Sequence, residues 1–173
     1  MKTALFSIVI ALITTASVRA DSTSVEIKDV HLCCQSCVKG VQSAIKPGTG
    51  VTASCDQDAG TVSLTGPDAA SVQKATDALV AAGYYGKSSS SAIKVNASTG
   101  AKGEKVQSLK VEGVHLCCGK CVKSVNEALA TVPGVAGNTA TKGAKSFTVT
   151  GDFKDTDVFN ALQKAGLTGH EGS

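Results

Sequence analysis

The chain contains one ten-residue motif twice, and this repeat constrains the fold more than any other feature. Residues 30–39 have the sequence VHLCCQSCVK, and residues 114–123, 84 positions further on, have the sequence VHLCCGKCVK. The three cysteines of each motif stand in the same register. Because each copy must carry its own core, we expect two small domains of about 65 residues, a size that often depends on metals or disulfides.

The first 20 residues have the pattern of a secretory signal peptide. Lys2 gives a positive start, residues 4–13 are almost entirely apolar, and Val18 and Ala20 place small residues before a polar stretch. The apolar run is too short to span a membrane. A retained amphipathic anchor is disfavoured because this run has no polar face. We therefore expect a secreted or periplasmic protein without a stable membrane anchor after cleavage.

The charge balance excludes several classes of function. Cleavage would remove Lys2 and Arg19, which leaves 15 basic residues against 14 acidic ones. No clustered basic face is present, so we expect no nucleic-acid partner. The three histidines have no acidic cluster beside them. Without a paired base and nucleophile, the chain is not expected to be an enzyme.

Each copy has the same order of predicted elements. Alternating and helical apolar periods in the first copy predict a strand over 25–30, a helix from Cys37, strands over 50–55 and 61–65, a second helix between Asp68 and Gly83, and a weak strand over 84–87. The second copy predicts a strand over 109–114, a helix from Cys121, strands from 135 and over 146–150, a helix that ends at Gly166, and a weak strand over 167–170. This order predicts an α+β chain of two tandem ferredoxin-like βαββαβ sandwiches.

The predicted boundaries follow from composition. After the signal peptide over 1–20, we expect a first domain over 21–87, a flexible linker over 88–105 and a second domain over 106–173. The linker is rich in Ser, Gly and Lys, which cannot bury enough apolar surface to order itself. A stray strand over 92–95 is one alternative within it. In the predicted topology, the cysteine loop of each domain lies at the same end as the following hairpin turn.

The cysteine spacing predicts a site for soft metal ions. Cys37 and Cys121 fall in the first turn of a helix, and Cys34 and Cys118 lie just before it. A helix N-terminus lowers the pKa of a thiol, and the Cys-x-x-Cys spacing lets both sulfurs converge on one point. Thiolates select Cu(I), Zn(II), Cd(II) or Hg(II) over Mg(II) and Ca(II).

At this loop the chain resembles the heavy-metal-associated domain family, which includes copper chaperones, the N-terminal domains of metal ATPases and periplasmic mercury-binding proteins. The resemblance covers residues 25–87 and 109–170. It rests on the position of Cys-x-x-Cys, the element order and the Gly-Val start of the second strand. It implies a ferredoxin-like fold and a metal transporter or another metal-binding domain as partner. The two thiols of the family match Cys34 and Cys37, and Cys118 and Cys121.

The motif also departs from the family pattern. Leu32 and Leu116 stand at the usual methionine and should pack beneath the loop. Four further residues per chain are candidate ligands beyond the two-thiol pattern: Cys33, Cys117, His31 and His115. Two thiolates suit linear Cu(I) or Hg(II), whereas three or four ligands favour Zn(II) or Cd(II). The ligand count, the metal, and the sharing of one ion between the domains stay open.

Two further residues and one rival function complete the predictions. Cys55 is expected to be a small buried strand residue, and His170 a tail residue rather than a ligand. The leading hypothesis is an exported protein that binds a soft metal ion for sequestration, chaperoning or relay. The alternative is a thiol–disulfide exchange protein of an oxidising compartment, because Cys-x-x-Cys is also a redox spacing. Structural disulfides within each motif would need strained short loops.

Overall fold

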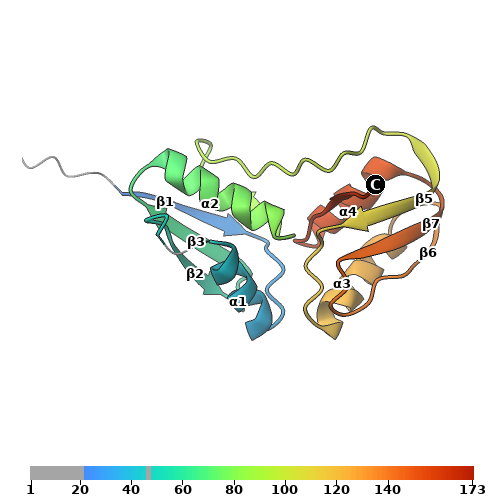
Figure 1. Ribbon diagram of the computed structural model, residues 1–173, viewed down its shortest axis with the longest axis horizontal. Coiled ribbons are helices and arrows are strands. Elements are labelled where there is room, and N and C mark those ends of the chain that lie inside the picture. The colour runs from blue at the N-terminus through green and yellow to red at the C-terminus, as the bar shows by residue number, and fades with distance from the viewer. Residues whose placement is uncertain (1–21, 46–47) are drawn as a thin grey trace, which may run out of the picture.

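The computed structural model describes residues 22–45 and 48–173, and it contains two α+β halves (Figure 1). The predicted signal peptide lies outside the described residues. Within the described residues, no helix is both long and apolar enough to cross a membrane.

The first half, residues 22–88, has the predicted element order. Its elements are β1 (Thr23–Lys28), α1 (Gln35–Ala44), β2 (Thr52–Asp56), β3 (Thr61–Gly66), α2 (Ala69–Ala81) and β4 (Lys87–Ser88). The strands form an antiparallel sheet in the order β2-β3-β1-β4. This is the order of a ferredoxin-like sheet, in which the two helices cover one face.

The second half, residues 105–173, repeats this architecture. Its elements are β5 (Lys105–Glu112), α3 (Gly119–Ala130), β6 (Val135–Asn138), β7 (Ser146–Lys154), α4 (Asp155–Lys164) and β8 (His170–Glu171). The antiparallel order β6-β7-β5-β8 corresponds strand by strand to the first sheet.

Alternation along the central strands builds each core. In the first half, Val25 and Ile27 of β1 pair with Leu64 and Val62 of β3, and all four are buried. Leu79 of α2 is fully buried over the same face. Each such side chain contributes about 1.5–3 kcal/mol when it leaves water. The period-two pattern of the sequence therefore fixes which face of the sheet the helices cover.

The helix starts agree with the predicted ones, whereas the last strands differ. Cys37 and Cys121 lie in the first turn of α1 and α3, and Cys34 and Cys118 are the N-cap residues. The last strands, β4 and β8, pair over only two residues each, three residues later than predicted. Residues 92–95 form no strand, so that prediction is wrong.

Residues 89–104 connect the halves without a helix or strand and run along one edge of the molecule (Figure 1). Their composition predicted flexibility, which stays a prediction. The structure nevertheless gives this segment fixed contacts. Ile93 is buried, and the Gln73 side chain accepts from the Lys94 amide and donates to its carbonyl, both at 2.8 Å. Near the other end, the Asp155 carboxylate accepts from the backbone amides of Lys102 and Gly103 at 2.8 Å.

The two halves dock through the turns that follow their second helices. Tyr84 and Leu167 form an antiparallel bridge, the Tyr85 amide donates to Gly166 at 3.1 Å, and the Thr168 amide donates to Gly83 at 3.0 Å. These turns lie against the cysteine loop of the opposite half, where the His31 amide also donates to Gly166 at 3.2 Å. As a result, the two cysteine loops face each other at the centre of the molecule (Figure 1).

Two glycines make this close docking possible. Both have positive φ, +89° for Gly83 and +76° for Gly166. A Cβ on Gly83 would lie 2.3 Å from the Gly113 carbonyl oxygen, and one on Gly166 would lie 2.4 Å from the Asp29 carbonyl oxygen. The sequence predicted both glycines as helix terminators. The structure adds that each allows the opposite backbone to approach.

Candidate metal centre

The two motifs contribute to one cluster of sulfur atoms rather than to two separate sites. Ten pairs of these atoms are 3.4 to 3.9 Å apart. We call this group the six-thiol cluster, and its members are Cys33, Cys34, Cys37, Cys117, Cys118 and Cys121. All of them are free thiols.

The start of α1 accounts for the chemistry of Cys34. Cys34 is the N-cap residue in extended conformation, and its carbonyl accepts from the Cys37 amide at 2.9 Å. Burial raises the pKa of the Cys34 thiol, but the backbone amides of Cys37 and Ser36 outweigh this and lower the pKa to about 6. Unpaired amides at a helix start stabilise a thiolate in this way. Cys118 occupies the equivalent N-cap position of α3.

Cys37 and Cys121 form the buried centre of the cluster. Their side chains are fully buried, and their sulfurs are 3.9 Å apart. The contact between them lowers the pKa of Cys121 and raises the pKa of Cys37, whose burial raises it further. A soft cation could displace the thiol proton of this pair, because metal binding to thiols releases protons.

The additional cysteine of each motif faces the opposite half. Cys33 lies 3.4 Å from Cys118 and 3.5 Å from Cys121, whereas Cys117 lies 3.5 Å from Cys37. Burial is the main cause that raises the pKa of the Cys33 thiol. Burial likewise raises the pKa of the Cys117 thiol, which reaches about 12. The sequence left open whether these two residues are ligands. Their position between the halves brings them into the cluster.

The two motif histidines occupy different environments. One ring nitrogen of His31 lies within 4.8 Å of the sulfurs of Cys33 and Cys121. The Nε2 atom of His31 is buried without a hydrogen-bond partner. His31 is therefore placed to ligate a metal or to donate to a thiolate. Of the two candidate histidines, His31 is the one whose ring nitrogen lies close to sulfur atoms of the cluster.

His115 instead contacts Tyr84, a residue that the sequence did not mark as part of the site. The two rings stack with centroids 4.5 Å apart, and the Tyr84 hydroxyl lies 3.0 Å from His115 Nε2. The same hydroxyl donates to the Cys37 carbonyl at 2.7 Å. Burial lowers the pKa of His115 and is the main cause that raises the pKa of Tyr84. The sequence offers one signal for this contact: the residue after the glycine that ends the second helix is Tyr84 in the first half but Leu167 in the second.

The other residues that the sequence singled out lie outside the six-thiol cluster. Leu32 and Leu116 are buried beneath their loops, as expected for the methionine position. Cys55 is half-buried on β2, and burial raises its pKa. His170 lies 3.9 Å from Glu112. Within the described chain, neither Cys55 nor His170 belongs to a group of side chains that could hold a metal.

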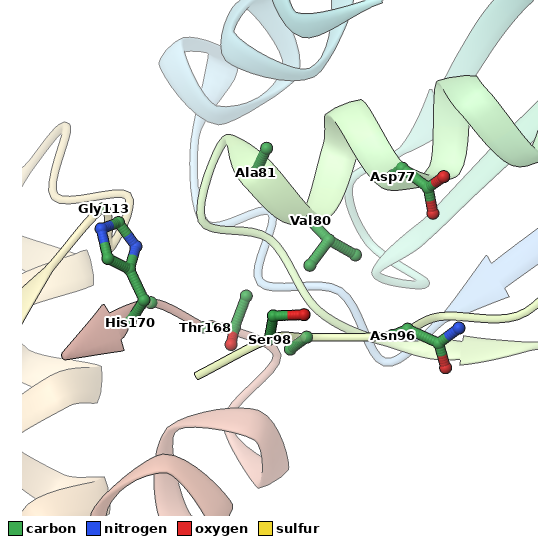
Figure 2. A pocket seen from close by; sticks show the side chains of 10 residues that line it. Asp77, Val80, Ala81, Asn96, Ser98, Gly113, Thr168 and His170 are labelled. Atoms are coloured by element: carbon green, nitrogen blue, oxygen red, sulfur yellow. The ribbon is translucent and has the colours of Figure 1, made fainter. Parts of the chain in front are cut away.

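A separate hollow of about 310 Å³ lies between α2, residues 96–98 and the start of β8. Figure 2 shows Val80 and Asp77 of α2 on one side of it and Thr168 and His170 on the other. Its lining residues, all within the described ranges, include no thiol. We therefore place the candidate site at the six-thiol cluster and not in this hollow.

Comparisons with known proteins give only a loose likeness. No family model and no curated protein matches the chain. Among solved structures, the N-terminal soluble domains of Bacillus subtilis CopA align over 88% of this chain and 95% of theirs, with 16% identity and a TM-score of 0.34. The first two RRM domains of yeast poly(U)-binding protein Pub1 align over 87% of this chain and 98% of theirs, with 11% identity and a TM-score of 0.25. Likeness at these scores supports no conclusion about family, and the clustered cysteines alone indicate metal binding.

Proposed function

We propose that this chain is an exported protein that binds soft metal ions through its two Cys-Cys-x-x-Cys loops and sequesters or relays them without catalysis. The observation that carries the proposal is the convergence of six free thiols on one place between the halves. Thiolates select Cu(I), Zn(II), Cd(II) or Hg(II). Cys34, Cys37, Cys118 and Cys121 are the main ligands, and Cys33 and Cys117 join them.

The exposure of the cluster supports a relay as well as storage. Cys37 and Cys121 are fully buried, whereas Cys34 and Cys118 are half-buried. An incoming thiolate can therefore reach one side of a bound ion while the buried thiols still hold it. The partner would be a metal transporter or another metal-binding domain. Export is inferred from the signal-peptide pattern of residues 1–20.

The rival function, thiol–disulfide exchange, uses two thiols, one that attacks and one that resolves. Here each sulfur contacts three or four others, and the contacts join both halves. Such convergence exceeds the needs of a redox pair and matches the needs of an ion that takes several ligands. Metal binding is therefore the preferred function.

Native mass spectrometry of the reduced protein with Cu(I), Zn(II) and Hg(II) tests the proposal. We expect stoichiometric binding of at least one of these ions. Replacement of Cys34, Cys37, Cys118 and Cys121 by Ser should abolish it. The variant Cys55→Ser is the matched control, because this thiol lies outside the cluster, and it should bind like the parent. Absence of binding together with insulin-reducing activity would establish the rival function.

A further inference from the structure

The six sulfurs group into triangles that share corners. Cys34, Cys37 and Cys117 form one triangle with edges of 3.9, 3.5 and 3.8 Å. A second consists of Cys33, Cys37 and Cys121, with edges of 3.6, 3.9 and 3.5 Å. The centre of a triangle of this size lies about 2.1 Å from each corner, close to a metal–thiolate bond of about 2.3 Å. Each triangle therefore has the dimensions of a trigonal site.

Two more triangles share only corners with these two. Cys33, Cys34 and Cys118 lie within 4.8 Å of one another, as do Cys117, Cys118 and Cys121. Cys118 contacts Cys33 at 3.4 Å and Cys34 at 3.8 Å. Cys121 contacts Cys117 at 3.6 Å and Cys118 at 3.7 Å. These triangles are slightly more open, because each contains two cysteines that are adjacent in the chain.

The four triangles have a specific connectivity. Within this set of four, every sulfur is a corner of two triangles, and any two triangles share one sulfur. The sulfurs also form other triangles of the same size, such as Cys33, Cys118 and Cys121 with edges of 3.4, 3.7 and 3.5 Å, but these share an edge with a member of the set. A thiolate has lone pairs enough to bridge two soft ions. Four ions on six bridging thiolates, each ion with three sulfur neighbours, have this same connectivity. Separate binding of one ion by each Cys-x-x-Cys pair would leave Cys33 and Cys117 unused.

The charge of the cluster selects the class of ion. Six thiolates around one divalent ion would leave four negative charges in a largely buried place, which is unfavourable without pairing. Four monovalent ions would leave two. Two divalent ions would also leave two, but they would occupy only two of the four triangles. Four divalent ions would reverse the sign, and Zn(II) would need a fourth ligand for each tetrahedral site. A monovalent soft ion that accepts three sulfurs fits best, and Cu(I) has these properties.

The geometry points to one composite site in which both halves together hold a tetranuclear Cu(I)–thiolate cluster, an inference that rests on the proposed function and specifies its cargo. Loading releases the protons that the thiols still carry, leaves all six sulfurs as thiolates and changes no oxidation state, because copper enters as Cu(I). Since three of the four triangles contain sulfurs from both halves, the loaded cluster also clamps the halves together.

A Cu(I) titration of the reduced full chain, followed by native mass spectrometry in the presence of a competing Cu(I) chelator, tests this inference. We expect the metal-free species to convert to a four-copper species, with one-, two- and three-copper species as minor components. Saturation at one or two ions per chain would overturn the tetranuclear site and leave the proposed function intact. Absence of any Cu(I), Zn(II) or Hg(II) binding would overturn both.

Two variants sharpen the stoichiometry. The double variant Cys33→Ser/Cys117→Ser keeps both Cys-x-x-Cys pairs, so it should fall from four ions to two and lose cooperative loading. Cys55→Ser changes a thiol outside the cluster and should still take four. Equal saturation of the double variant and the parent would overturn the inference, because the bridging role of Cys33 and Cys117 would then be absent. Circular dichroism of each variant checks that it is folded.

Discussion

The two halves carry nearly the same motif, yet they use its histidine differently. In the second half, His115 stacks on Tyr84 and its Nε2 lies 3.0 Å from the tyrosine hydroxyl. In the first half, His31 meets the turn that contains Leu167, and its Nε2 is left buried without a partner. Leucine offers no polar atom, so His31 remains available to the sulfurs of the cluster. Residues outside a repeat thus decide what each copy can do.

The largest predicted effect concerns what the halves share, namely close docking through glycine. We expect Gly83→Ala and Gly166→Ala each to destabilise the protein by about 3 kcal/mol, since positive φ and a backbone clash act together. Hydrogen exchange of the Tyr85 and Thr168 amides, which donate across the interface, measures the loss of docking.

Gly103→Ala is the matched control for these variants. Gly103 has φ of +82°, but a Cβ there would meet nothing within 4 Å. This variant should therefore pay only the backbone strain, about 1 kcal/mol. Equal exchange rates and stabilities for all three variants would show that the halves do not approach each other at Gly83 and Gly166.

The second prediction removes the feature by which the halves differ. Tyr84→Phe deletes a hydroxyl that contacts His115 and donates to the Cys37 carbonyl at 2.7 Å. Because the Cys37 carbonyl loses one donor and the half-buried His115 ring loses a hydrogen-bond partner, we expect a loss of about 1–3 kcal/mol in urea unfolding. Tyr85→Phe is the control, since its ring is half-buried and the described residues offer its hydroxyl no partner. A change under about 0.5 kcal/mol is expected there, and a similar loss in both variants would contradict the assigned role of Tyr84.

The third prediction compares the loss of each motif histidine in stability and in Cu(I) affinity. His115→Ala should lower stability by about 1 kcal/mol, because stacking and a hydrogen bond are lost. His31→Ala should change stability less, since its buried Nε2 has no partner to lose. Cu(I) competition titrations should reverse the order, with about a tenfold loss of affinity for His31→Ala alone, the size typical of residues around a metal. Equal affinities for the two variants would remove His31 from the site.

The sequence was sufficient for the order of elements and for the location of the thiols. Both follow from local patterns: apolar alternation along β1 and β5, helical spacing after each motif, and cysteines at a helix start. Short edge strands were placed less well. The pairing of β4 and β8 over two residues depends on contacts with β1 and β5 rather than on their own composition.

The composite nature of the site could not be predicted, because it depends on how two separate cores dock. Nothing local to Gly83 or Gly166 distinguishes a helix terminator from a point of close approach. Likewise, a tyrosine at position 84 and a leucine at position 167 gain meaning only once the turns lie against the opposite loops. The sequence left open whether Cys33 and Cys117 are ligands, and only the docking of the halves brings each within 3.5 Å of a sulfur of the other half.

The smallest predicted effect concerns a difference between α2 and α4, the second helices of the two halves. Gln73 of α2 holds the connecting segment at Lys94 through two hydrogen bonds of 2.8 Å. Gln73→Ala should cost only about 0.5 kcal/mol, because these exposed bonds are replaced by bonds to water, but it should speed hydrogen exchange of the Lys94 amide. Gln163→Ala on α4 is the control and should leave that exchange unchanged. If Lys94 already exchanges at the rate of a free peptide in the parent protein, the connecting segment is flexible in solution, as its composition predicts.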